Sequence, residues 1–170
     1  MAGNQLGKTV AGAAEWAMHL TGQYPDDWTG YRYGGPIILL AGSESYELTR
    51  DGVQRLLVGP PEQEENWGTG FIPHASIVGT DRRQGVPNAL ENIAVRHVSG
   101  GTSVCQFKAY EQGRGKWQAA TVHGVWFDEE PDDEIYSEGL TRTNKGQRGR
   151  FTIMTFTPLL GMSNVVCRFI

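Results

Sequence analysis

The spacing of apolar residues in the first third of the chain predicts a helix, a strand and a second helix. Residues 8–20 are rich in alanine and repeat their apolar positions at helical spacing. The short apolar run over 37–42 predicts a buried strand. Residues 43–58 then predict a helix, which either Ser43 or Ser45 can cap.

Further along, strand and helix patterns alternate. Residues 59–92 hold many glycines and prolines and are expected to form a long loop outside the core. The expected elements after it are a hairpin of strands at 93–98 and 104–110, a strand at 122–127, a helix at 131–142, a strand at 151–156 and a last helix starting at 159. Strands interleaved with helices predict the α/β class.

Composition and charge restrict the fold and function classes in four ways. The 23 glycines among 170 residues are about twice the usual share and indicate a loop-rich fold. The net charge of -4 does not suit a chain that binds nucleic acid over its whole surface, and the longest apolar run is too short to span a membrane. Cys105 and Cys167 are expected to be free thiols in a reducing cytoplasm, with a disulfide as the alternative.

The start of the chain carries the first chemical motif. Ala2 to Thr9, AGNQLGKT, match the phosphate-loop pattern with alanine in place of the first glycine. In that pattern Lys8 reaches the β and γ phosphates of ATP, and Thr9 binds Mg²⁺ at the helix N-terminus. The expected nucleotide-binding residues are Gly3, Asn4, Gln5, Leu6, Gly7, Lys8 and Thr9. A chance match in a glycine-rich chain is the alternative, which the predicted helix over 8–20 disfavours.

A second motif lies at the end of the predicted strand 122–127, where VWF is followed by Asp128, Glu129 and Glu130. Asp128 at a strand end can hold Mg²⁺, and Glu129 can orient and deprotonate a water for attack on the γ phosphate. The alternative is a solvated acidic turn. Both motifs in this order favour a P-loop ATPase of the class that has an additional strand between them and a catalytic glutamate.

The predicted strand 151–156 ends in hydroxyl groups. Thr155 and Thr157 can sense the γ phosphate and pass its loss to a moving segment. An ordinary strand end is the alternative. The four histidines, His19, His74, His97 and His123, lack metal-ligand spacing and are expected to serve as surface or core side chains.

Four segments together, AGNQLGKT, YEQGRGKWQ, VWFDEEP and TFTPLLGMSNVV, resemble the ATPase domain of phage terminase large subunits, which package double-stranded DNA into a procapsid. The resemblance runs from Ala2 to the end of the chain. It implies a RecA-like P-loop NTPase fold, a three-layer α/β sandwich that hydrolyses ATP with Mg²⁺. It also implies Lys8 and Glu129 as catalytic residues, Thr9 and Asp128 as Mg²⁺ ligands, and Thr155 to Thr157 as the coupling motif.

The resemblance further implies partners: double-stranded DNA, a portal protein, a small terminase subunit and a homo-oligomeric ring on the procapsid, in the host cytoplasm and without a membrane. It implies an arginine supplied in trans to a neighbour's γ phosphate, for which Arg114 occupies the expected region. An exposed turn arginine is the alternative. Arg142, Lys145, Arg148 and Arg150 form a basic run that either contacts DNA phosphates or is a solvated loop.

The chain also departs from the family pattern. Only Met1 and Ala2 precede the phosphate loop, so the strand that should lead into it is expected to be missing, at a cost in stability. Residues 1–170 are expected to be a partial ATPase domain that stops before the nuclease domain and does not cleave DNA. Two alternatives stay open: a catalytically incomplete fragment that acts as an interaction module, and another RecA-like or helicase-like ATPase.

Overall fold

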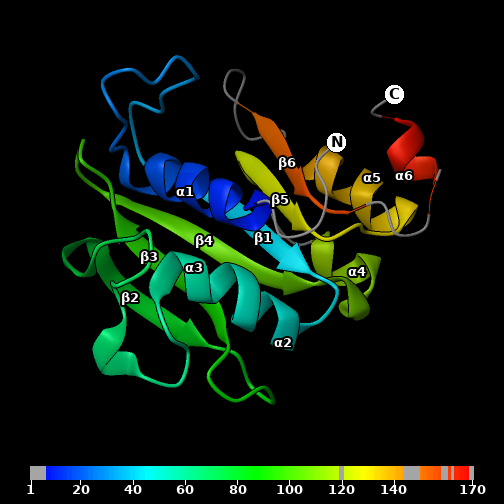
Figure 1. Ribbon diagram of the computed structural model, residues 1–170, viewed down its shortest axis with the longest axis horizontal. Helices are drawn as coiled ribbons and strands as arrows, with labels where there is room; N and C mark the ends of the chain where they lie inside the picture. The colour runs from blue at the N-terminus through cyan, green and yellow to red at the C-terminus, as the bar shows by residue number, and fades with distance from the viewer. Residues whose placement is uncertain (1–6, 119–120, 144–149, 158–160, 162, 169–170) are drawn as a thin grey trace.

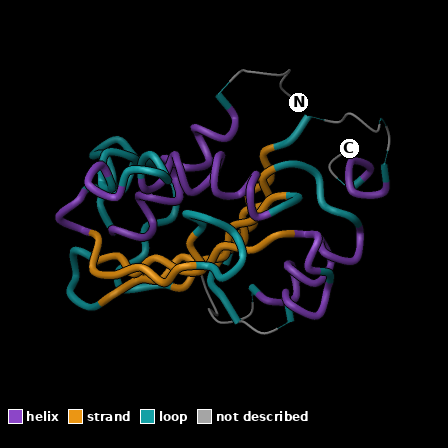
Figure 2. The backbone as a smooth tube through the Cα atoms, turned by 90° about the horizontal axis from the view of Figure 1, so that it is seen from below, coloured by secondary structure: helices purple, strands orange, loops and turns teal. Residues whose placement is uncertain are grey.

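The computed structural model describes residues 7–118, 121–143, 150–157, 161 and 163–168. In these ranges one mixed six-stranded sheet has helices on both faces, as Figures 1 and 2 show. The strand order is β2-β3-β4-β1-β5-β6. The strands are β1 (Ile38–Ser43), β2 (Ile77–Arg82), β3 (Leu90–Arg96), β4 (Thr102–Ala109), β5 (Gly124–Asp128) and β6 (Phe151–Thr155). The predicted three-layer α/β fold is confirmed.

The sheet has a parallel half and an antiparallel half. β4, β1, β5 and β6 run parallel, with Ala41 beside Trp126 and Asp128 beside Thr155 in the register. β2, β3 and β4 pair antiparallel, and the predicted hairpin is formed by β3 and β4. Parallel strands bring their carboxyl ends to one edge of the sheet, where open α/β sheets bind ligands.

The first helical layer begins directly after Gly7. α1 (Lys8–Thr21) follows Gly7 and ends at Gly22, and both glycines have positive φ, 76° and 71°. Its buried face packs on Trp126 and the sheet through Trp16 and Leu20. Gly12 lies so close to Trp126 that a Cβ there would be 2.9 Å from the indole ring, so α1 approaches the sheet closely at this point.

The predicted helix over 43–58 forms as three joined turns in the same layer. α2 (Tyr46–Thr49) is capped by Ser45, whose hydroxyl accepts from the Leu48 N–H at 3.1 Å. A π-helical segment, η1 (Arg50–Gln54), leads into α3 (Arg55–Val58), which ends at Gly59. Short 3-10 turns elsewhere are η2 (Glu64–Asn66), η3 (His74–Ser76) and η4 (Tyr110–Gln112).

The other face of the sheet carries α4 (Arg114–Trp117), α5 (Asp133–Arg142) and α6 (Asn164–Cys167). A second apolar cluster lies between these helices and the sheet, with Trp117, Phe127 and Tyr136 among its members. The Trp117 and Phe127 rings stack at 5.5 Å between centroids. Through Phe127, this layer packs against the end of β5 on the face opposite α1.

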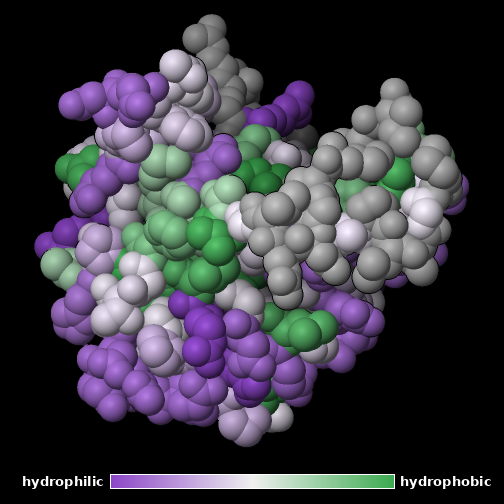
Figure 3. All heavy atoms as spheres, in the orientation of Figure 1, coloured by the Kyte–Doolittle hydropathy of each residue, from purple (hydrophilic) through white to green (hydrophobic). Residues whose placement is uncertain are grey.

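Two predicted elements differ from the structure. Residues 59–92 are not a single loop, because β2 and the first residues of β3 lie within them. β2 is an edge strand of mostly exposed or half-buried residues, so its sequence lacks an apolar alternation. Figure 3 shows a mostly polar surface where residues 59–89 lie, in the lower part of that face. The last helix begins at Asn164, after Leu159, which is outside the described residues.

Some expectations concern single residues or the chain ends. Cys105 is buried and Cys167 exposed, and no disulfide joins these two cysteines. In the ranges that the structure describes, no helix has the length and apolar character needed to cross a membrane. The strand expected to be missing before the phosphate loop stays a prediction, because residues 1–6 are outside these ranges.

Candidate active site

The N-terminus of α1 meets the carboxyl ends of β5 and β6. Of the predicted phosphate loop, Gly7, Lys8 and Thr9 are described, whereas Gly3, Asn4, Gln5 and Leu6 are outside the described residues. Gly7 has φ 76°, which favours glycine, and its carbonyl accepts the Ala11 N–H at 2.9 Å in the first turn. Lys8 and Thr9 therefore stand at the positive end of a 14-residue helix.

Asp128 is the centre of a chain of hydrogen bonds. It is the last residue of β5, and only 7% of it is exposed. Thr9 Oγ1 and Thr155 Oγ1 both donate to Asp128 Oδ1, at 3.0 and 2.7 Å. The Trp126 indole N–H donates to Thr155 Oγ1 at 2.7 Å. Because an indole N–H can only donate, it leaves the Thr155 hydroxyl proton for Asp128.

The surroundings of Asp128 suit a divalent cation. Burial raises the pKa of the Asp128 carboxyl, while hydrogen bonds from Thr155 and Thr9 and the charge of Lys8 act in the opposite direction. Among the described residues none donates to Asp128 Oδ2. A hydroxyl beside a carboxylate is a hard oxygen donor set of the kind Mg²⁺ prefers. Thr9 and Asp128 therefore fit the predicted Mg²⁺ site.

Glu129 directly follows Asp128, at the end of β5. Its φ is 70°, a left-handed conformation that is uncommon for a residue with a side chain. Its N–H donates to the Thr155 carbonyl at 3.0 Å, and its side chain is exposed. Partial burial and the neighbouring charge of Asp128 raise the pKa of Glu129, and Lys8 acts against that rise. A carboxylate with a raised pKa is better suited to accept a proton.

The two coupling threonines contact different parts of the site. The Thr155 hydroxyl donates to Asp128 Oδ1, whereas Lys8 Nζ donates to Thr157 Oγ1 at 3.1 Å. The structure thus brings Lys8, Thr9, Asp128, Thr155 and Thr157 together. Glu130, the last acidic residue of the second motif, accepts a hydrogen bond from Ser163 Oγ.

A cavity of about 610 Å³ opens beside these groups. It is lined by Glu44, Tyr110, Glu111, Glu129, Glu130, Asp132 and Thr157. Five of these seven residues carry carboxylates, so the lining is acidic. Sequence reasoning assigned no role to Tyr110 or Trp126, although YEQGRGKWQ and VWFDEEP, which contain them, are two of the segments that carry the family resemblance.

The predicted trans arginine lies away from this cluster. Arg114 begins α4, and its Nε donates to Glu138 Oε2 at 2.9 Å, with 58% of its side chain exposed. Arg142 of the basic run bonds the same Glu138, through its Nε at 2.7 Å. Arg150 lines a separate pocket with Trp28 and Tyr31. Lys145 and Arg148 are outside the described residues.

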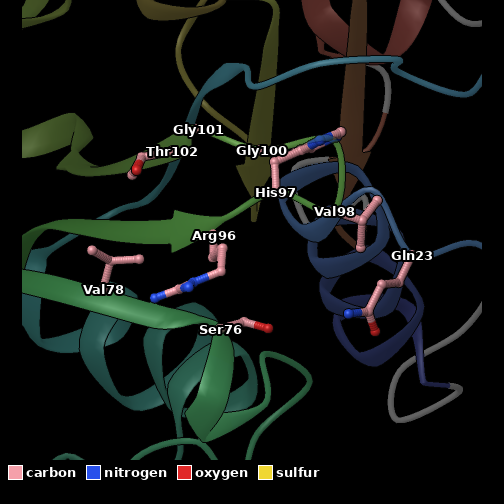
Figure 4. Close-up of a pocket in the computed structure, with 9 residues that line it drawn as sticks. All are labelled: Gln23, Ser76, Val78, Arg96, His97, Val98, Gly100, Gly101 and Thr102. Carbon is pink, nitrogen blue, oxygen red and sulfur yellow. The ribbon is translucent and has the colours of Figure 1, made fainter.

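A further pocket of about 420 Å³ lies at the opposite ends of the parallel strands. Figure 4 shows Arg96, His97 and Val98 around it, with Gln23 at the end of α1. His97 is buried against Gly22, and burial lowers its pKa, so it packs as a neutral ring. This pocket contains none of the predicted nucleotide-binding or catalytic residues.

Known proteins are similar to this chain in sequence. The terminase large subunit of Salmonella phage P22 is 46% identical over 187 aligned positions, which cover 100% of this chain and 37% of that protein. The terminase large subunit of Enterobacteria phage LP7 is 33% identical over 134 positions, 76% of this chain and 27% of that protein. This chain therefore spans about a third of the length of these relatives.

Solved structures agree in fold. The large terminase of a thermophilic bacteriophage, in complex with ATP-gamma-S, matches 89% of this chain and 30% of its own, with a TM-score of 0.56 at 10% identity. The complex of the same large terminase with ADP matches 90% of this chain and 31% of its own, with a TM-score of 0.54 at 13% identity. The predicted P-loop NTPase fold is thereby confirmed.

The family comparison covers the whole chain. Residues 1–170 match the family described as terminase large subunit, T4likevirus-type, N-terminal. This match and the identity to the P22 protein agree with the resemblance carried by the four sequence segments. The chain therefore belongs to the terminase large subunit family.

Proposed function

We propose that residues 1–170 are part of the ATPase domain of a DNA-packaging motor and that they bind and hydrolyse Mg-ATP to drive double-stranded DNA into a procapsid. The observation that carries this proposal is the hydrogen bond from Thr9 to Asp128, which joins the first turn of α1 to the end of β5. Glu129 lies directly beside that junction. The nucleotides in the complexes of the thermophilic phage terminase support the same interpretation of the fold.

In the proposed mechanism each side chain has one task. Lys8, at the positive end of α1, neutralises the γ phosphate. Thr9 and Asp128 would hold Mg²⁺, which would supply positive charge to the phosphate groups. Glu129 accepts a proton from water as the water oxygen bonds to the γ phosphorus and the bond to the ADP oxygen breaks. The products are ADP, phosphate and a protonated Glu129, which returns its proton to solvent.

Coupling is proposed to begin at the contact of Lys8 with Thr157. The Lys8 ammonium donates a hydrogen bond to the Thr157 hydroxyl, and a γ phosphate would compete for the same ammonium. Arrival and loss of that phosphate would change the position of Thr157 and of the segment after β6. Thr155 is bonded to Asp128 and would hold the metal ligand during this exchange.

The partners belong to the proposal as well. Double-stranded DNA is the proposed cargo, with a portal protein, a small terminase subunit and a ring of copies in the host cytoplasm as the expected setting. For Arg114 to act on a neighbour's γ phosphate, its guanidinium would have to leave Glu138. Its 58% exposure leaves room for that movement.

The test is Glu129→Gln, with Glu65→Gln as the control, because Glu65 is an exposed carboxylate in a different part of the chain. We expect Glu129→Gln to bind Mg-ATP as the unaltered protein does and to hydrolyse it about 10²–10⁴-fold more slowly, the usual contribution of a general base. Glu65→Gln should hydrolyse ATP normally.

Other outcomes separate the alternatives. Substantial hydrolysis by Glu129→Gln would move the catalytic role to Glu130 or elsewhere. Nucleotide binding without hydrolysis by the unaltered protein would favour an interaction module. DNA-stimulated hydrolysis that drives no packaging into a procapsid would favour a helicase-like ATPase.

A further inference from the structure

A buried tyrosine lies behind the catalytic edge of the sheet. Tyr110 directly follows β4 and is only 9% exposed. Its ring packs against both Trp117 and Phe127, with centroids 5.7 and 6.2 Å away. This packing fixes the ring and aims its hydroxyl at the carboxyl ends of β1 and β5.

The Tyr110 hydroxyl meets three backbone carbonyls at once. Its oxygen is 3.0 Å from the carbonyl oxygens of Gly42, Asp128 and Glu129. Carbonyl oxygens only accept hydrogen bonds, so the phenol must donate, and burial raises its pKa well above the usual value and keeps it protonated. The single O–H is thus shared at a point where three carbonyl dipoles converge.

Two of these carbonyls belong to the peptide planes on either side of the Glu129 Cα. Rotation of the peptide plane that contains the Asp128 carbonyl changes φ of Glu129. Rotation of the plane that contains the Glu129 carbonyl changes ψ of the same residue. Glu129 and Asn88 are the non-glycine residues with positive φ in the described part of the chain. A left-handed glutamate persists only where its surroundings hold it.

We propose that Tyr110 is the positioning residue that holds Glu129 in its left-handed conformation and so directs the Glu129 carboxylate at the attacking water. This inference rests on the proposed function, in which Glu129 is the base. The hydroxyl of Tyr110 bonds backbone carbonyls behind the site rather than the side chains of Lys8 or Thr9, so its role is separate from nucleotide binding.

The test compares Tyr110→Phe with Tyr46→Phe. Tyr46 is also buried, at 3% exposure, and its hydroxyl donates to Gln112 Oε1 at 2.8 Å. We expect Tyr110→Phe to lower kcat by about 10–100-fold, because misplacing a catalytic group by 1 Å costs about that much. Its Kd for Mg-ATP should stay within about twofold of the unaltered protein. Tyr46→Phe should change neither value.

A double variant separates positioning from a general structural effect. If Tyr110 acts through Glu129, then Tyr110→Phe should not slow the Glu129→Gln protein further. Equal losses in both backgrounds would overturn the proposal, and so would a Tyr110→Phe protein as active as Tyr46→Phe.

A crystal structure of Tyr110→Phe gives an answer that does not depend on activity. We expect Glu129 to leave the left-handed region in that variant, and an unchanged φ near 70° would overturn the role of Tyr110. Absence of hydrolysis by the unaltered protein would instead count against the proposed function, while this structure still decides the role of Tyr110.

Discussion

Two buried carboxylates in this molecule have opposite surroundings. Asp128, at the end of β5, receives only the hydroxyl groups of Thr9 and Thr155 among the described residues, and burial raises its pKa. Glu138, on α5, is 3% exposed. Burial also acts to raise the pKa of Glu138, but hydrogen bonds from Arg114 and Arg142 outweigh it and lower that pKa. The charge of Glu138 is matched by two guanidinium groups, whereas the Asp128 carboxylate has two hydroxyl donors and the nearby charge of Lys8, and is the proposed ligand of a cation.

The largest loss of stability is expected from removing one of the two guanidinium partners of Glu138. Arg142→Ala leaves the buried Glu138 with Arg114 alone, whose side chain is mostly exposed. Breaking a fully buried pair costs about 3–5 kcal/mol. We expect a loss of about 2 kcal/mol, because Arg114 remains and Arg142 is itself partly exposed. Urea unfolding monitored by tryptophan fluorescence measures this loss.

The control for that experiment is Arg168→Ala. Arg168 Nη2 and Asp133 Oδ1 are 2.6 Å apart, but both side chains are more than two-fifths exposed. An exposed pair of this kind contributes about 0–1 kcal/mol. An Arg142→Ala protein no less stable than Arg168→Ala would show that Glu138 does not depend on its guanidinium partners.

A smaller change in stability, in the stabilising direction, is expected for the Asp128→Asn variant. Because burial raises its folded-state pKa above the unfolded value of about 3.9, the ionised carboxylate destabilises the fold. That cost is absent below about pH 4 and grows as the pH rises through the folded pKa. Asp128→Asn should therefore raise Tm at pH 7, by about 2–4 °C for each kcal/mol relieved, and should leave it almost unchanged near pH 4.

The Glu138→Gln variant is expected to change stability in the direction opposite to Asp128→Asn. Its folded pKa is lowered, so its ionised form stabilises the fold above the unfolded pKa of about 4.3, and that stability is lost as the pH falls through the folded pKa. We therefore expect Glu138→Gln to lower Tm at pH 7. The same sign of change in both variants, measured by differential scanning calorimetry without nucleotide or Mg²⁺, would contradict the contrast.

The sequence predicted the parts of the site that are local. Lys8 and Thr9 follow a glycine loop and begin a helix, and Asp128 ends an apolar strand, so neighbouring residues indicate each of them. The same is true of the β3–β4 hairpin. Local pattern is enough because loop, cap and strand end are set by residues a few positions apart.

The parts that the sequence could not predict depend on contacts between distant segments. The hydroxyl of Tyr110 meets carbonyls of Gly42 and Glu129, which no short motif connects. The pairing of Arg114 with Glu138 likewise required α4 and α5 to be placed together. A left-handed Glu129 ran against the expectation that positive φ favours glycine.

The most direct test of the account is whether the end of the phosphate loop and Asp128 form a nucleotide site. The measurement is calorimetric titration of the protein with Mg-ATP, beside Lys8→Ala and beside Lys116→Ala as an exposed lysine control on α4. We predict binding by the unaltered protein and by Lys116→Ala, and loss of at least about tenfold in affinity for Lys8→Ala, since one charge-assisted hydrogen bond to a phosphate contributes at least that much. No binding by the folded, unaltered protein, or equal affinity in all three, would contradict the account.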